Sequence, residues 1–260
     1  MRNLRVPGET AKKITKLSFI VPAYNEEARL GKCLESILAA TANFSVPTEI
    51  IVVNNASTDK TKEVARSYPG IIVVDEPRKG LPSARQAGHL ASTGEIEAHI
   101  DADTLMSPGW PEKVAIEFAK NPNLVALSGP YIYYDMSLLI RAGVKIWYGF
   151  AYLLHFVNHR VLKIGAIVQG GNFAVRKTAL EKIGGFNLDA GFYSEDADLA
   201  RRIQSTGRVK FTFFLPLKTS GRRFRGDGLF KTGWNYAVNH FWTMYRHRPF
   251  SREYKDIRLK

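Results

Sequence analysis

Residues 96–104, IEAHIDADT, lead from a short apolar stretch directly into two aspartates, Asp101 and Asp103. A carboxylate at the end of a buried strand costs free energy unless water or a positively charged partner compensates it. Two carboxylates in Asp-x-Asp spacing can face the same way once the chain leaves the strand, and they then offer hard oxygen ligands to Mg²⁺ or Mn²⁺. The same spacing also occurs by chance in solvated turns. The rest of the sequence is therefore needed to distinguish a turn from a cation site.

Apolar runs like the one before Asp101 recur along the chain. They occupy residues 17–22, 49–53, 71–74, 96–100 and 124–129. Segments with helical spacing of apolar residues alternate with the first four runs, which predicts an α/β fold with a mostly parallel central sheet and helices on both faces. Ligands of such sheets bind beyond the carboxyl ends of the strands. Because the polar segments PAYNEE, NNASTD and DAD each follow an apolar run, we expect them to meet at one rim of the sheet.

The second half of the chain is less regular. Residues 137–158 predict a long apolar helix, for which we expect burial in the core, with a position at a membrane interface as the alternative. Residues 167–177, IVQGGNFAVRK, predict a turn followed by a strand. Residues 194–207, SEDADLARRIQSTG, predict a helix that begins near Glu195 and ends before Gly207.

The composition indicates an ordinary globular protein. The chain has 260 residues, of which 45% are hydrophobic, and this suffices for one large α/β domain with a substantial core. The single cysteine, Cys33, excludes an internal disulfide framework and is expected in the core. The charged N-terminus has no apolar signal region, and no run of about 18 uncharged apolar residues is present. We therefore expect a cytoplasmic protein, with peripheral attachment to the inner face of the cell membrane as an alternative.

The net charge of +13 is concentrated near the end of the chain. Residues 201–260 contain 15 Lys and Arg against 3 Asp and Glu, a net charge of +12, whereas the other 200 residues have a net charge of +1. Such asymmetry favours an anionic partner, such as a phospholipid surface, a phosphate-bearing substrate or a nucleic acid. A solvated basic surface that serves only solubility is the alternative.

Three further segments contain residues suited to chemistry. Glu195 and Asp196 lie in the predicted first turn of a helix, where they either complement the helix dipole or supply a general base. The two glycines of GGN, residues 170–172, let the backbone approach a ligand closely or form a plain turn. Arg222 and Arg223, within SGRRFRGDG, suit phosphate oxygens or form an exposed basic loop.

Taken together and in order, these segments resemble the family-2 glycosyltransferases of the GT-A fold. The resemblance covers roughly residues 17–225. It rests on FIVPAYNEEARLGKCLESIL, VVNNASTDKT, GLPSARQAGHLASTGEIEAHIDADT, GGNFAVRKTALEKIGGFN and FYSEDADLARRI. One such motif is weak evidence, whereas five in the right order are strong evidence.

The resemblance implies roles for individual residues. Donor contacts are implied for Pro22, Ala23, Tyr24, Glu26, Asn54, Asn55, Arg85, Asp101, Arg222 and Arg223. Asp103 and Asp101 are the implied ligands of a divalent metal, Mn²⁺ or Mg²⁺. Asp196 is the implied catalytic base, supported by Glu195, and Gly171 and Asn172 lie on the implied acceptor side.

The family also implies a reaction. An acceptor hydroxyl loses its proton to Asp196 and displaces a nucleotide diphosphate from the sugar with inversion. Asn54 or Asn55 stands where the family usually has an aspartate that reads the base, and an amide can donate as well as accept. A UDP-sugar is therefore the first expectation and a GDP-sugar stays open. The acceptor is a saccharide or a lipid-linked glycan, as in the synthesis of cell-surface polysaccharides or glycolipids.

The resemblance also divides the chain. We expect a basic extension at residues 1–16, a GT-A domain at 17–225 and a basic, aromatic helical tail at 226–260. Within the domain, residues 17–105 form the nucleotide-binding half and residues 106–225 the acceptor half. The tail suits an anionic membrane surface, or it closes the acceptor side of the core.

Three other functions are alternatives to a glycosyltransferase. A nucleotidyltransferase would need a glycine-rich phosphate loop after its first strand, and VPAYNEEARLG contains none. A nucleic-acid-binding module is possible in principle because aromatic and basic residues interleave in the tail, but no known binding motif is present. The last alternative is a glycosyltransferase-like protein whose catalysis is impaired.

Overall fold

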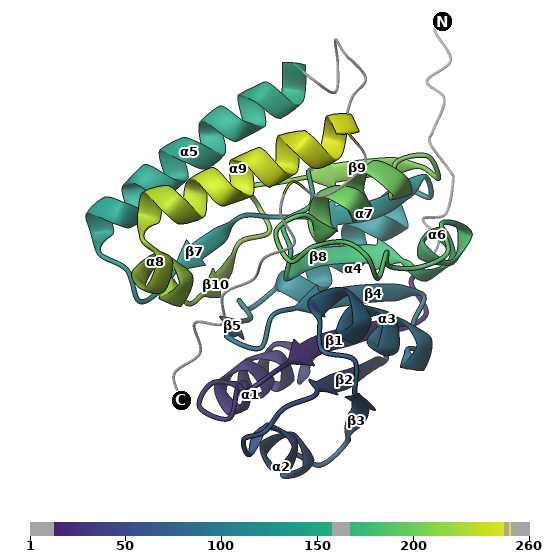
Figure 1. The fold of residues 1–260 in the computed structure, drawn as a ribbon. Coiled ribbons are helices and arrows are strands. Elements are labelled where there is room, and N and C mark those ends of the chain that lie inside the picture. Colours follow the sequence, from purple (N-terminus) through teal and green to yellow (C-terminus); the bar gives the residue numbers. More distant parts are fainter. Residues whose placement is uncertain (1–12, 158–166, 247–249, 251–260) are drawn as a thin grey trace, which may run out of the picture.

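In the computed structural model, residues 13–157, 167–246 and 250 are described, and they form an α/β fold around a seven-stranded sheet (Figure 1). The strands, in sheet order, are β3 (Ile71–Glu76), β2 (Thr48–Asn55), β1 (Leu17–Ala23), β4 (Ile96–Ile100), β8 (Asn172–Arg176), β6 (Leu124–Ser128) and β9 (Arg208–Phe211). Only the two pairings of β8 in this sheet are antiparallel. The expected mostly parallel sheet is confirmed. Most of the predicted N-terminal extension and the end of the predicted tail lie outside the described residues.

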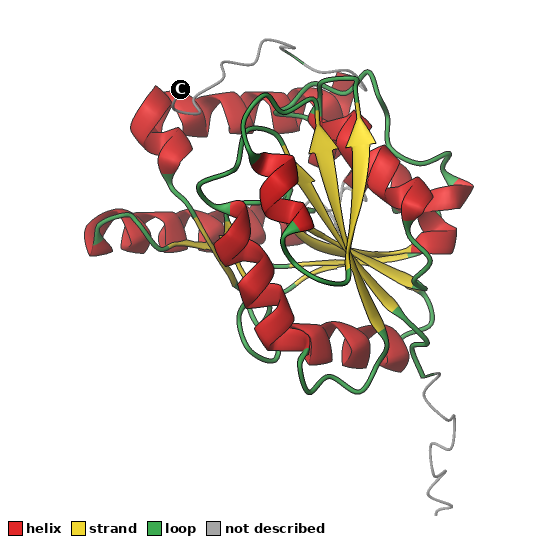
Figure 2. Ribbon diagram, turned by 90° about the horizontal axis from the view of Figure 1, so that it is seen from below, coloured by secondary structure: helices red, strands yellow, loops and turns green. Residues whose placement is uncertain are grey.

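Helices cover both faces of this sheet, as Figure 2 shows. The first face carries α1 (Leu30–Thr41), α2 (Thr61–Arg66) and α4 (Trp110–Lys120); the second carries α3 (Leu81–Ala91), α6 (Lys177–Lys182) and α7 (Glu195–Ile203). Side chains alternate along a strand, so Phe19 of β1 packs in the core with Cys33 on the first face, whereas Ile20 packs with Ala84 on the second. The predicted core position of Cys33 is confirmed.

The reversed direction of β8 places its beginning beside the end of β4. Ile100, the last residue of β4, is in register with Asn172, the first residue of β8. The glycine turn before β8 therefore lies next to the Asp101–Asp103 segment after β4. If β8 ran parallel to β4, the glycines would lie beside the beginning of β4, at the other end of the strands.

A small second sheet brings a late segment of the chain to the same place. It consists of β5 (Thr104–Leu105), β10 (Leu217–Thr219) and β7 (Tyr131–Tyr133). Thr219 of β10 is in register with Thr104, the residue after Asp103. The short helix α8 (Arg222–Asp227) follows directly, so Arg222 returns to the end of β4.

Two long helices, α5 (Leu138–Val157) and α9 (Leu229–Arg246), lie at the top of Figure 1, and α9 contacts α7 and α8. The expected burial of the apolar helix in the core is wrong for the first part of α5. Leu138, Leu139 and Ile146 are 79%, 85% and 74% exposed, and none of the described core clusters includes a residue of α5. Among the described helices, none combines the length and the apolarity needed to cross a bilayer.

The packing of α3 on β1 gives the first prediction. A Cβ atom at Gly88 would lie 2.3 Å from Cγ2 of the buried Ile20. Overpacking of this kind costs about 1–3 kcal/mol, which at so short a separation should outweigh the gain of about 1 kcal/mol in helix propensity. Gly88→Ala should therefore lower the free energy of unfolding in urea.

The matched control is Gly233→Ala in α9, where no described atom lies within 4 Å of the added Cβ. There only the helix propensity changes, so the free energy of unfolding should rise by about 1 kcal/mol or less. Equal effects of the two substitutions would contradict the close packing of α3 on β1.

Candidate active site

The candidate site lies at the carboxyl ends of β1, β2 and β4 and at the beginning of β8. Ala23 ends β1 beside Asn54 of β2, because these two residues are in register. Asp101 and Asp103 follow β4, and Glu195 and Asp196 open α7. The structure thus brings the predicted polar segments to one rim of the sheet.

Arg85 of α3 joins the two acidic pairs. Its side chain is completely buried, and Nη1 donates a hydrogen bond to Oε2 of Glu195 at 2.9 Å. Nη2 lies 3.4 Å from Oδ1 of Asp101, and the guanidinium carbon lies 4.9 Å from the centre of the Phe173 ring. Burial raises the pKa of Glu195 to about 8, although the nearby guanidinium of Arg85 acts in the opposite direction. In this arrangement Arg85 supports the carboxylates and has no surface left for a ligand.

A second connection runs through Tyr131, which the sequence analysis missed. The Tyr131 hydroxyl lies 3.0 Å from Oδ2 of Asp101 and 2.6 Å from the carbonyl oxygen of Gly170. The Gly170 amide in turn donates to Oδ2 of Asp196 at 3.3 Å. Asp101 and Asp196 therefore belong to one hydrogen-bonded cluster. Tyr131 stands on a strand of three residues, which is too short to leave a periodic signal in the sequence.

The two residues predicted on the acceptor side have different positions. Gly171 has φ +74°, and a Cβ there would lie 2.1 Å from Cγ of Asp101, so only glycine fits. Asn172 is fully buried, which departs from the expected contact with a ligand. Its Nδ2 donates to the carbonyl oxygens of Pro130 and Leu215, each at 3.0 Å. Asn172 thus fixes the start of β8.

Asp103 is buried beside a cation that the chain itself provides. Oδ2 of Asp103 lies 3.0 Å from Nε of Arg222, and Oδ1 accepts a hydrogen bond from the Thr219 hydroxyl at 3.3 Å. Both terminal nitrogens of Arg222 donate to the carboxylate of Glu26, which is also buried. Burial raises the pKa of Asp103 to about 6, and Arg222 partly offsets this. Glu26, predicted to touch the nucleoside, is in this structure a partner of Arg222.

The predicted base-reading residues, Asn54 and Asn55, are the last two residues of β2. Nδ2 of Asn55 donates to the carbonyl oxygens of Glu76 and Arg78, and its Oδ1 accepts from the Gly80 amide. Asn55 therefore orders the loop that leads into α3. Nδ2 of Asn54 donates to Oδ1 of Asp75 at 2.8 Å, so the next strand places a carboxylate beside this amide. The sequence analysis missed Asp75, which ends no recognised motif.

The remaining predicted donor contacts lie around these residues. Pro22 is in register with Val53 at the end of β1. The Tyr24 hydroxyl accepts a hydrogen bond from Nζ of Lys79 at 2.7 Å. Arg223 donates to the Tyr193 hydroxyl at 3.3 Å and lies 4.5 Å from the centre of the Phe192 ring, which puts it on the α7 side of the site.

The residues fit a divalent metal that takes part of its coordination from a ligand. Within the described residues there is no group of three or more His, Cys, Asp or Glu side chains that could hold an ion alone. Asp101 and Asp103 nevertheless offer carboxylate oxygens, and ions such as Mg²⁺ commonly bind one or two carboxylates together with substrate phosphates. Asp103 already has a guanidinium against it, which shows that a cation is accommodated there.

Comparison with protein families assigns the chain. Residues 18–184 match the sequence profile described as Glycosyl transferase family 2, and the chain belongs to this family. The match covers the first three segments on which the resemblance rests and most of GGNFAVRKTALEKIGGFN, and it ends before FYSEDADLARRI.

Curated relatives carry glycosyltransferase names. The probable glycosyltransferase YdaM of Bacillus subtilis is 29% identical over 224 residues, which cover 79% of this chain and 50% of that protein. The dolichyl-phosphate beta-glucosyltransferase ALG5A of Trichomonas vaginalis is 43% identical over 97 residues, 34% of this chain and 30% of that protein. The chain thus spans half or less of the length of these two relatives.

Solved structures share the fold. The mannosyltransferase PcManGT of Pyrobaculum calidifontis, in complex with GDP-Man and Mn²⁺, has a TM-score of 0.66 at 21% identity, over 95% of this chain and 67% of that chain. Glucosyl-3-phosphoglycerate synthase of Mycobacterium tuberculosis, in complex with Mn²⁺, UDP-Glc and phosphoglyceric acid, has a TM-score of 0.59 at 17% identity, over 92% of this chain and 81% of that chain. The GT-A fold expected from the sequence is confirmed.

The buried position of Arg85 gives a prediction for stability. Arg85→Met leaves the Glu195 carboxylate buried without its cation, and breaking a buried pair in this way costs about 3–5 kcal/mol. Burial already raises the pKa of Glu195 to about 8 from 4.5, and loss of Arg85 raises this pKa further. At a pH between 4.5, the ordinary pKa of a glutamate, and the raised pKa of Glu195, this carboxylate holds a proton in the folded variant but not in the unfolded chain. The variant therefore gains stability as the pH falls from 8 to 6. The wild type gains stability in the same direction but by less, so the free energy of unfolding lost by the variant relative to the wild type should be larger at pH 8 than at pH 6.

Urea unfolding of the variant at pH 8 and at pH 6 measures this effect. The control is Arg78→Met, which removes an arginine that is mostly exposed and pairs with Glu76; there the loss should be much smaller than at Arg85, because solvent screens an exposed ion pair. A loss at Arg85 that does not depend on pH would show that Glu195 is not the group left without a partner.

Proposed function

We propose that this chain is an inverting glycosyltransferase that moves a sugar from a nucleotide diphosphate to an acceptor hydroxyl. The observation that carries the proposal is the contact of Arg85 with one member of each acidic pair, Asp101 of the pair Asp101 and Asp103, and Glu195 of the pair Glu195 and Asp196. Family membership and the nucleotide sugars bound by the structural neighbours support it. As in the sequence analysis, we assign residues 17–105 to the nucleotide-binding half and residues 106–225 to the acceptor half.

Asp196 is the general base of the proposed reaction. Its Oδ1 accepts from the Ala197 amide at 2.8 Å and its Oδ2 from the Gly170 amide at 3.3 Å, so two backbone donors orient the carboxylate. It takes the proton of the acceptor hydroxyl while the acceptor oxygen bonds to the anomeric carbon. The bond from that carbon to the diphosphate breaks on the opposite face, which inverts the configuration. Glu195 stays with Arg85 and fixes the start of α7.

Asp103 and Asp101 would hold the divalent ion, Mn²⁺ or Mg²⁺. When bound, such an ion neutralises charge on the departing diphosphate. For the donor, a UDP-sugar and a GDP-sugar are both compatible with the residues at the carboxyl ends of β2 and β3. Asn54 offers an amide and Asp75 a carboxylate, so donors and acceptors are both present for a base edge.

Two substitutions separate the roles. Asp196→Asn should lower kcat by about 10²–10⁴-fold, the usual contribution of a general base, and should leave nucleotide binding intact. Asp103→Asn should remove the rise in melting temperature that Mn²⁺ with UDP or GDP gives the wild type, because that rise reports a ligand bound only by the folded state. An NMR spectrum of the product identifies its anomer.

Thermal shift with UDP, GDP, CDP and dTDP, each with and without Mn²⁺, identifies the donor class. Stabilisation by one diphosphate that needs both Mn²⁺ and Asp103 supports the proposal. If no diphosphate stabilises the wild type, the glycosyltransferase-like protein with impaired catalysis becomes the better account. Retention of configuration in the product would contradict the direct displacement.

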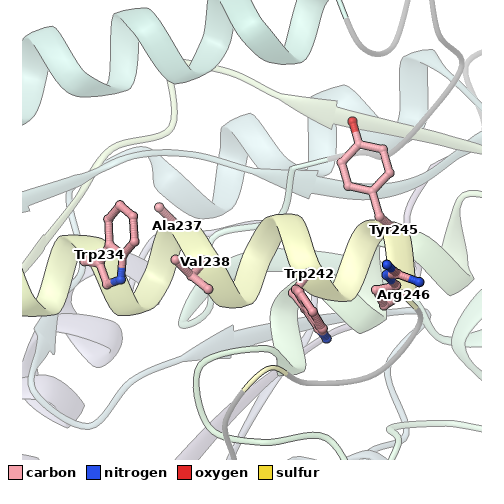
Figure 3. A pocket seen from close by; sticks show the side chains of 6 residues that line it. All are labelled: Trp234, Ala237, Val238, Trp242, Tyr245 and Arg246. Atoms are coloured by element: carbon pink, nitrogen blue, oxygen red, sulfur yellow. The ribbon is translucent and has the colours of Figure 1, made fainter.

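We also propose that the exposed parts of α5 and α9 place the enzyme on an anionic membrane, at the inner face of the cell membrane. We use the term α5/α9 surface for the exposed residues of these two helices, which are the apolar Leu138, Leu139, Ile146, Trp234 and Tyr245 and the basic Lys145, Lys231 and Arg246. A hollow of about 390 Å³ on α9 adds to it (Figure 3). Its lining residues are Trp234, Ala237, Val238, Trp242, Tyr245 and Arg246.

Aromatic and aliphatic side chains beside basic ones are typical of helices at an interface with anionic lipid. A lipid-linked acceptor would then be within reach, as the name of the Trichomonas relative suggests. The described residues contain no other feature that explains three strongly exposed apolar side chains near the start of α5.

Cosedimentation with vesicles of phosphatidylglycerol and phosphatidylcholine tests the α5/α9 surface. Leu139→Ser should weaken binding several-fold, because burial of a leucine contributes about 1.5–3 kcal/mol, and binding should fall with added salt. The control is Leu90→Ser, which removes a leucine of similar exposure from α3 and should leave binding unchanged. Absence of binding by the wild type at low salt would overturn this part of the proposal.

A further inference from the structure

Arg222 forms a clasp between the two segments that meet at the donor side of the site. Its Nε lies 3.0 Å from Oδ2 of Asp103, after β4, and its two terminal nitrogens donate to the carboxylate of Glu26, after β1. Both carboxylates are almost completely buried. Arg222 is the first residue of α8 and is far from Glu26 and Asp103 in the sequence.

Charge compensation explains why the clasp is there. A buried carboxylate without a cation is strongly destabilising, and here two of them share one guanidinium. The bidentate geometry toward Glu26 suits arginine and not lysine. These three groups together have a net charge of −1 when both carboxylates are ionised, and Arg29 also lowers the pKa of Asp103 from nearby.

The clasp also occupies Asp103. Its Oδ2 faces Nε of Arg222, and its Oδ1 accepts from the Thr219 hydroxyl. A divalent ion that binds Asp103 needs an oxygen that is now in contact with a donor. We propose that Arg222 competes with the divalent ion for Asp103 and leaves it when a diphosphate enters. This inference rests on the proposed function, which makes Asp103 a metal ligand.

The surroundings of α8 indicate which part would move. Asp135 accepts hydrogen bonds from the Gly221 amide at 2.6 Å, from the Ser220 hydroxyl at 2.7 Å and from Nη2 of Arg225 at 2.8 Å. The backbone before α8 is therefore anchored, and the side chain of Arg222 is the part that changes partner. A guanidinium released from Asp103 is well suited to bind diphosphate oxygens.

The consequence is cooperative binding of metal and nucleotide. Metal alone has to displace the guanidinium, whereas a diphosphate draws the guanidinium away and leaves Asp103 to the metal. Each ligand then raises the affinity for the other by the same factor, as linkage requires. Arg222 is in this account a positioning residue that sets the order and strength of metal binding.

A titration with Mn²⁺ alone tests this competition without turnover. The electron paramagnetic resonance signal of free Mn²⁺ measures how much of the ion the protein has bound. Arg222→Gln should bind Mn²⁺ roughly tenfold more tightly than the wild type, within the range of about 5–150-fold that coupling between sites usually spans. A residue that only stabilises the fold would not raise metal affinity when removed. The control is Arg225→Gln, which removes a charge from the same helix but pairs with Asp135 and should leave the affinity unchanged.

Arg222→Lys provides the second variant if Arg222→Gln does not fold. A single ammonium cannot hold both carboxylates as the guanidinium does, so Mn²⁺ should again bind more tightly than in the wild type, by a smaller factor. With UDP or GDP present, the advantage of either variant should disappear, since the wild-type guanidinium has then left Asp103.

Equal or weaker Mn²⁺ binding by the variants overturns the clasp. The proposed function survives that result if the wild type still binds Mn²⁺ together with a nucleotide diphosphate. If the wild type binds no Mn²⁺ with or without nucleotide, and the variants bind none either, both the clasp and the metal-dependent function are overturned.

Discussion

Arg85 carries its guanidinium into the interior of the protein, and Glu195 and Asp101 compensate its charge from two distant segments. An unpaired charge in such a place would cost several kcal/mol, so α3, the end of β4 and the start of α7 have to meet before Arg85 can be buried. The candidate site is therefore assembled by the same contact that closes this part of the core. The carboxylates of Asp101 and Glu195 therefore reach their positions only when this part of the core has folded.

Much of the fold was predictable because its signals are local. The apolar runs that became β1, β2, β3, β4 and β6 are short and bounded by polar segments. The rule that ligands gather beyond the carboxyl ends of parallel strands then brought Asp101 and Asp103 together with the residues after β1 and β2. The pairing of β8 against β4 is not local, and no pattern in the sequence indicates it.

Several features of the site depend on contacts between residues far apart in the chain. The clasp of Arg222 on Asp103 needs β10 beside β5, and these strands are too short to leave a pattern. Tyr131 reaches Asp101 for a similar reason. The exposure of Leu138 and Leu139 was missed because an apolar helix shows its composition but not whether another element covers it.

Motif residues also proved to have more than one kind of role. Asn55 and Asn172 lie inside recognised motifs, yet their side chains hold backbone carbonyls within the protein. They shape the loops from which other groups face the site. A motif therefore marks the residues that a site requires. It does not distinguish residues that contact a ligand from residues that only hold the neighbouring loops in position.

The chain between β7 and β8 leaves the sheets and returns to nearly the same point. The Tyr131 hydroxyl at its beginning lies 2.6 Å from the Gly170 carbonyl at its end. The described residues of this segment, 134–157 with α5 and 167–169, thus lie between two ends that adjoin. The entropy of closing such a loop grows only slowly with its length. The segment can accordingly be lengthened, shortened or replaced at small entropic cost while the seven-stranded sheet stays in place, and a new recognition segment can be grafted at the same two ends.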